Sequence, residues 1–85
     1  MSIKAEEIKI FEEGTKTIYR KDIRSSYQLV VIPHSVSEIE KDAFSGNSSY
    51  VVYVGTVADF DNINLNGEIS TPCIYCTDGL KILAL

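Results

Sequence analysis

The sequence predicts a mainly β fold in which about three coils of 21 residues stack into a short solenoid. Apolar residues recur at an interval of 21, and each interval opens with a run rich in Val, Ile and Tyr. A period of about 21 is too short for a helix pair and fits one coil of a β-rich solenoid. We expect the recurring rows to lie over one another and to supply the core: Ile8, Leu29 and Tyr50; Ile10, Val31, Val52 and Cys73; Phe11, Ile32, Tyr53 and Ile74; Ile18, Ile39 and Phe60; and Ile23, Phe44 and Leu65.

Parallel strands are expected where each coil begins. Their ranges are 8–11, 29–32, 50–54 and 73–76, and the apolar segment 80–85 is suited to a last strand. The chain is then one domain, with a cap at 1–7, coils at 8–28, 29–49 and 50–72, and closing strands at 73–85. Little helix is predicted, with short helical or 3₁₀ turns at 41–44 and 57–63 on the outside of the coils.

Composition limits the function classes. The chain has 85 residues, of which 45% are apolar and 24% charged, so it is a small folded domain with a marginal core. A net charge of −4 argues against binding of nucleic acid or of an anionic membrane surface. No apolar run approaches the roughly 18 residues of a spanning helix. No signal peptide is visible, and the localisation stays open.

The second unit carries a recognisable motif. It contains Ile32-Pro33, Ser35-Val36, Ile39 and Ala43-Phe44 at a fixed spacing. This pattern resembles the BspA-like, bacterial surface-antigen class of leucine-rich repeats. The third unit resembles a variant ending of that family, in which a Tyr-x-Gly-Thr stretch (53–56) is followed by an acidic residue and an aromatic (Asp59-Phe60). The closing 74–79 segment resembles such an ending as well. The first unit departs from the pattern, since Asp22-Ile23 stands in place of Ala43-Phe44.

The resemblance implies a right-handed leucine-rich-repeat solenoid that contacts other proteins and performs no catalysis. The predicted function is an accessory subunit that docks on a larger assembly, and a virion or capsid surface is one candidate. The alternative is a terminal fragment of a bacterial cell-surface adhesin that binds a host or matrix protein. The predicted partner is a protein or a second copy of the chain, with no cofactor, no metal, no nucleic acid and no membrane insertion.

Residues that could carry chemistry are few. Cys73 and Cys76 form a C-x-x-C pair, which would serve zinc or redox chemistry only with further ligands or a helix N-terminus. Positions three apart on a strand point to opposite faces, so we expect structural cysteines, with Cys73 as a small core residue; a disulfide, a redox dithiol and metal binding are the alternatives. His34 has no evident catalytic partners. We therefore predict that the chain is not an enzyme.

Partner contacts are predicted on the tyrosines and on the apolar C-terminal segment. Tyr50 and Tyr53 are expected to face away from Val52, where rigid aromatic rings make good contact residues. Core packing with hydroxyls at the rim is the alternative for the tyrosines. The last segment would either cap the stack or pair with another chain. The candidate partner-binding residues are Tyr50, Tyr53, Tyr75, Leu80, Ile82, Leu83 and Leu85.

Overall fold

The computed structural model describes residues 3–44, 50–66, 71 and 73–83, and within them strands predominate. This confirms the prediction of a mainly β chain with little helix. Of the two predicted helical turns, the one at 57–63 contains the helix α1, whereas residues 41–44 form turns; the 3₁₀ segments η1 and η2 were not predicted. The elements are η1 (Ala5–Glu7), β1 (Ile8–Ile10), β2 (Thr17–Ile18), η2 (Arg20–Asp22), β3 (Leu29–Ile32), β4 (Glu38–Ile39), β5 (Tyr50–Tyr53), α1 (Val57–Asp61), β6 (Asn64–Leu65), β7 (Cys73–Cys76) and β8 (Gly79–Ile82).

The larger sheet contains five strands in the order β1-β3-β5-β7-β8. The first four are parallel, and β8 runs antiparallel to β7. Ile10 pairs with Val31 and Val31 with Val52, so the interval of 21 sets the register of the first three strands. The fourth strand departs from it, because Val52 pairs with Tyr75, an interval of 23 (75 minus 52). The expectation that Cys73 extends this row is therefore wrong.

The smaller sheet contains β2, β4 and β6, all parallel. Ile18 pairs with Ile39 at the expected interval, but Ile39 pairs with Leu65, an interval of 26 (65 minus 39). The predicted row of Ile18, Ile39 and Phe60 is thus wrong in its third member. Phe60 lies instead in α1, which extends the connection between β5 and β6, and its ring is buried.

Helix α1 begins at a capping box. The Thr56 hydroxyl accepts a hydrogen bond from the Asp59 amide (3.1 Å), and the Asp59 carboxylate accepts one from the Thr56 amide (3.3 Å). These contacts satisfy amides that a helix start leaves without partners, which explains how five residues hold a helical conformation. None of the helices in the described part of the chain is long and apolar enough to cross a bilayer.

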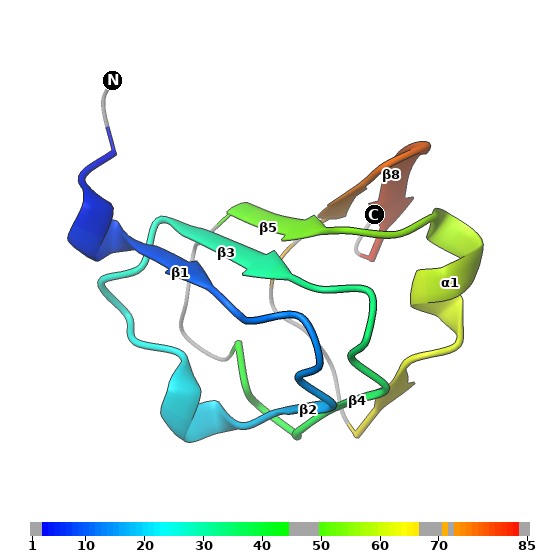
Figure 1. The fold of residues 1–85 in the computed structure, drawn as a ribbon, viewed down its shortest axis with the longest axis horizontal. Helices are drawn as coiled ribbons and strands as arrows, with labels where there is room; N and C mark the ends of the chain where they lie inside the picture. The colour runs from blue at the N-terminus through cyan, green and yellow to red at the C-terminus, as the bar shows by residue number, and fades with distance from the viewer. Residues whose placement is uncertain (1–2, 45–49, 67–70, 72, 84–85) are drawn as a thin grey trace.

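The core lies between the two sheets. Figure 1 shows β1, β3 and β5 side by side on one side of the molecule, with β2 and β4 on the other and α1 at the end that joins them. The buried apolar residues are Phe11, Ile18, Val30, Ile32, Val36, Ile39, Ala43, Phe44, Val51, Tyr53, Phe60, Ile63 and Ile74.

Two rows that we expected in the core lie on the side of the larger sheet that faces away from it. Val30 and Val51 are fully buried, whereas their neighbours Val31 and Val52 are only partly buried and Ile10 is exposed. Successive strand residues point to opposite faces, so burial of Val30 and Val51 places the rows containing Ile10 and Ile8 on the other face. The sequence assignment was wrong because both faces of these strands are apolar.

Strand β8 closes the larger sheet. It follows β7 through a two-residue turn, and it spans Gly79–Ile82 rather than 80–85. A salt bridge of 2.8 Å joins Lys81 Nζ to an Asp61 carboxylate oxygen at the end of α1. The C-terminal segment is therefore part of the sheet, as its edge strand. Leu85 lies outside the described residues.

Candidate docking surface

The side of the larger sheet that faces away from the core consists of ten apolar side chains, two from each strand. We call this set the outer face: Ile8, Ile10, Leu29, Val31, Tyr50, Val52, Cys73, Tyr75, Leu80 and Ile82. Parallel pairing brings Ile10, Val31, Val52 and Tyr75 into one row, and the antiparallel pair of Tyr75 and Leu80 completes it. Directly paired strand residues share a face, so the row is continuous across all five strands.

Much of this surface is open to solvent. The exposed fractions are 64% for Ile10, 58% for Tyr50, 52% for Leu80, 50% for Ile82 and 40% for Tyr75. These five are among eight large hydrophobic residues that are exposed in the described part of the chain, and Val54, just after β5, is another. Single exposed apolar residues are ordinary on a protein surface, but a contiguous group marks an interaction site.

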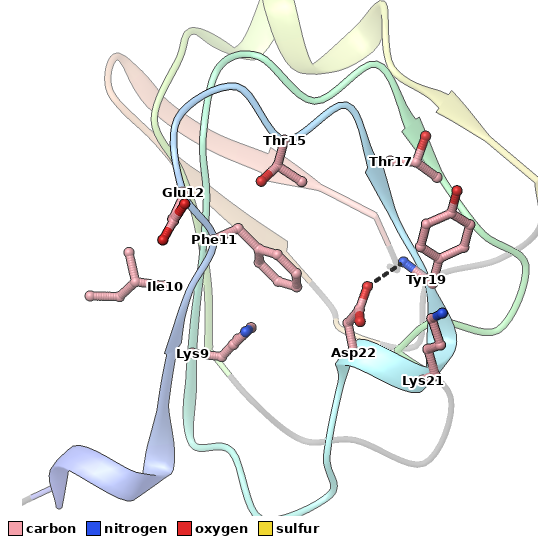
Figure 2. Close-up of a pocket in the computed structure, with 9 residues that line it drawn as sticks. All are labelled: Lys9, Ile10, Phe11, Glu12, Thr15, Thr17, Tyr19, Lys21 and Asp22. Atoms are coloured by element: carbon pink, nitrogen blue, oxygen red, sulfur yellow. Dashed lines mark hydrogen bonds between the residues drawn. The ribbon is translucent and has the colours of Figure 1, made fainter.

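The outer face carries no Lys, Arg, Asp or Glu. The two lysines of these strands point to the opposite side: Lys9 Nζ lies 5.0 Å from the Phe11 ring centroid, and Lys81 pairs with Asp61. Figure 2 shows Ile10 pointing away from Lys9 and Phe11. A surface of ten side chains without formal charge is unusual for a chain in which 24% of residues are charged.

Two aromatic rings meet on the outer face. Tyr50 and Tyr75 lie with their ring centroids 6.3 Å apart at a tilt of 55°. The neighbouring Cys73 raises the pKa of Tyr75 above its ordinary value of 10.0. Tyrosine side chains lose little conformational entropy on contact, and this pair is well suited to a partner's apolar surface.

Not every predicted contact residue belongs to this surface. Tyr53 is only 2% exposed, because it shares a face with Val51 rather than with Tyr50, and its ring packs edge-on against Phe60 at 5.4 Å. We therefore remove Tyr53 from the candidate site. Leu83 is partly buried and packs against the core. Sequence reasoning missed Ile10, although strict alternation along the strands would have placed it with Tyr50.

Burial of Tyr53 predicts a loss of stability in alkali. Burial, with the nearby Asp59 carboxylate and Cys76, raises the pKa of Tyr53 above its ordinary value of 10.0. Above that value the unfolded chain loses the phenolic proton more readily than the folded chain, so the free energy of unfolding falls as the pH rises. Below it both states keep the proton, and this group contributes no pH dependence.

Urea titrations between about pH 8 and pH 11 measure this effect. The variant Tyr53→Phe has no phenol to ionise and is expected to show a shallower decline. An equally steep decline in that variant would assign the alkaline sensitivity to other titrating groups, such as the Cys76 thiol.

A hollow of about 470 Å³ lies at the end of the molecule where β1 and β2 are the edge strands. Figure 2 shows Phe11 reaching toward it, while Tyr19 and Lys21 border it on the other side. Lys21 Nζ lies 5.4 Å from the Tyr19 ring centroid, and Asp22 accepts a hydrogen bond from the Tyr19 amide (3.3 Å). These side chains contact one another, and the hollow is the uncovered end of the two sheets.

A second hollow of about 240 Å³ brings His34, Ser35 and Asp59 to one place. Ser35 donates its hydroxyl hydrogen to the Thr15 carbonyl (2.8 Å), and Asp59 caps α1. The serine and the carboxylate are thus occupied by structural hydrogen bonds.

The two cysteines lie on opposite sides of β7. Both are free thiols; Cys73 lies on the outer face, whereas Cys76 packs against the core. Our placement of Cys73 in the core is therefore wrong. Burial raises the pKa of the Cys76 thiol, which keeps it protonated at neutral pH. Among the described residues, no three or more His, Cys, Asp and Glu are grouped as they would be around a metal ion.

Comparison with protein-family models, with curated proteins and with solved structures finds no match to this chain.

Proposed function

We propose that the chain is a short leucine-rich-repeat solenoid that acts as a non-enzymatic interaction module, an accessory subunit that docks on a protein assembly by its outer face. The solenoid is supported by the 21-residue register, which recurs in both sheets, from β1 to β3 and from β2 to β4. The resemblance of residues 29–44 to BspA-like repeats supports it as well.

The observation that carries the docking role is the uncharged, apolar outer face. Cores of protein interfaces are enriched in aromatic and apolar residues and depleted of charged ones, and the outer face has both properties. Nucleic acids and anionic membranes require a basic surface, which this face does not provide. A protein partner is the class of ligand that matches a rigid apolar sheet.

The proposal of a non-catalytic role is supported by the contacts and positions of the potentially reactive side chains. Ser35 and Asp59 make structural hydrogen bonds, and the Cys73 and Cys76 thiols lie on different faces. The proposed role requires only a stable surface.

Site-specific photo-crosslinking tests the proposed function. A photoreactive phenylalanine analogue replaces Tyr50 on the outer face, and in a matched protein it replaces Tyr19, an exposed tyrosine outside that face. Both proteins are irradiated in extract from the organism that produces the chain. We expect a discrete covalent adduct with a protein only from position 50, and we expect Ile10→Lys to abolish it.

The identity of the adduct separates the roles considered for this chain. A particle protein supports the assembly subunit, a host or matrix protein supports the adhesin, and a second copy of the chain supports self-association. Adducts that form equally from positions 19 and 50, or from neither, would overturn docking by the outer face.

A further inference from the structure

We propose that the occupant of the outer face is a second copy of this chain, packed face to face in a two-fold symmetric dimer. This inference rests on the proposed function, since it names the partner of the same surface. Three features of the outer face support it: the lack of charge, the exposed area, and the difference in exposure between side chains at its centre and at its edges.

The lack of charge suits contact with an identical surface. In a two-fold interface each patch meets itself, so a cluster of like charges would repel its own copy. Lys9 and Lys81 both point away from the outer face, and no charged residue replaces them there. Discrimination between different proteins depends largely on complementary charges, which this face lacks. Contact between two identical apolar sheets requires no complementary charges.

The area is adequate for a small dimer. Five large side chains expose 40% to 64% of their surface. With about 200 Å² for a large side chain, and smaller contributions from the half-buried ones, the outer face presents on the order of 600 Å². The largest patch on a typical monomer reaches about 300–600 Å², and each partner of a standard interface buries about 800 Å². Val54 and the polar residues that surround the outer face would supply the remaining area.

The unequal exposure of side chains across the face allows two copies to interdigitate. Val31 and Val52, at the centre of the sheet, have short side chains and are half-buried, whereas Ile10 on β1 and Leu80 on β8 are more than half exposed. Two sheets of this kind pack about 10 Å apart with their strands rotated by about 30°, so the more exposed side chains of one fill the space over the short side chains of the other.

Sedimentation velocity of the full chain, from about 1 µM to about 500 µM, tests the dimer, because this range brackets a micromolar dissociation constant. We expect a reversible monomer–dimer equilibrium that tightens with added salt, since each copy carries a net charge of −4. Tyr50→Lys and Ile10→Lys are each expected to weaken the dimer by about tenfold or more, as a charge is forced into an apolar contact. Tyr19→Lys, the matched control, is expected to leave it unchanged. A circular dichroism melt of each variant confirms that it is folded.

The native cysteines provide a second readout. Cys73 lies on the outer face, whereas Cys76 packs against the core. We expect alkylation of Cys73 to slow as the chain concentration rises and the dimer forms. Alkylation of Cys76 is expected to be slow at every concentration, because its thiol has a raised pKa and is partly buried.

Two results would overturn the second-copy proposal. One is a monomer across the whole concentration range. The other is a dimer that is insensitive to Tyr50→Lys and Ile10→Lys and leaves Cys73 reactive, which would place the contact at the free edge of β8. A monomer that still gives a position-50 adduct with a different protein leaves the proposed function intact, whereas loss of that adduct as well would overturn both.

Discussion

Replacing Phe44 by Ala is expected to lower the free energy of unfolding by about 3–5 kcal/mol, the usual cost of truncating a buried phenylalanine. Phe44 is 2% exposed and belongs to the core cluster between the two sheets. A domain of this size has a total stability of only about 5–10 kcal/mol, so the variant is expected to lose roughly a third to all of it. Thermal and urea denaturation followed by circular dichroism measure the change.

A matched control lies in the same turn. Lys41 is exposed, and Lys41→Ala is expected to change the stability by less than about 0.5 kcal/mol. Phe44→Leu keeps most of the apolar volume and provides a folded variant of intermediate stability if Phe44→Ala does not fold. A cooperative melt of Phe44→Ala within a degree of the parent would contradict its place in the core.

Gly55→Ala is expected to destabilise the chain by about 1–3 kcal/mol, the range typical of overpacking. A Cβ atom on Gly55 would lie 2.5 Å from Tyr53 Cε2 and 2.9 Å from Cζ, much closer than non-bonded atoms approach. The Tyr53 ring is buried and packs edge-on against Phe60, so it has little room to move. Urea denaturation of the two proteins measures the difference.

A double-mutant cycle isolates the contact. In a Tyr53→Leu background the ring atoms that the added methyl group would meet are absent, so the same glycine substitution is expected to cost much less. An equal cost in both backgrounds would show that the effect arises from the backbone at Gly55 and not from the close approach to Tyr53.

The sequence predicted the strands of the larger sheet well, because the runs rich in Val, Ile and Tyr coincide with the 21-residue repeat. β3 and β7 span the predicted ranges, and β1 and β5 each end one residue before the predicted limit. The repeat also predicted which strands pair, since Ile8 lies opposite Leu29 and Ile18 opposite Ile39. The repeat failed where α1 and the connections around it add residues between β4 and β6 and between β5 and β7, so that Leu65 follows Ile39 by 26 residues and Tyr75 follows Val52 by 23.

The candidate site was predicted only in part. Tyr50, Tyr75, Leu80 and Ile82 lie on the outer face, whereas Tyr53 does not, because strand side chains alternate and Tyr53 shares the parity of Val51. Ile10 and Val31 are also on that face, although their apolar row was assigned to the core. In strands with only one apolar face, such an assignment would have been correct.

The residue types and the repeat predict the positions of the strands in the larger sheet and the 21-residue spacing of the first pairs in each sheet. They do not predict which side of the larger sheet is buried, because apolar residues occupy both sides of β3, β5 and β7. The smaller sheet and α1 lie against one side, and burial there of Val30, Val51 and Ile74 leaves the equally apolar row of Ile10 and Tyr75 open to solvent. An apolar side chain is buried only where another element covers it, and that depends on the path of the whole chain.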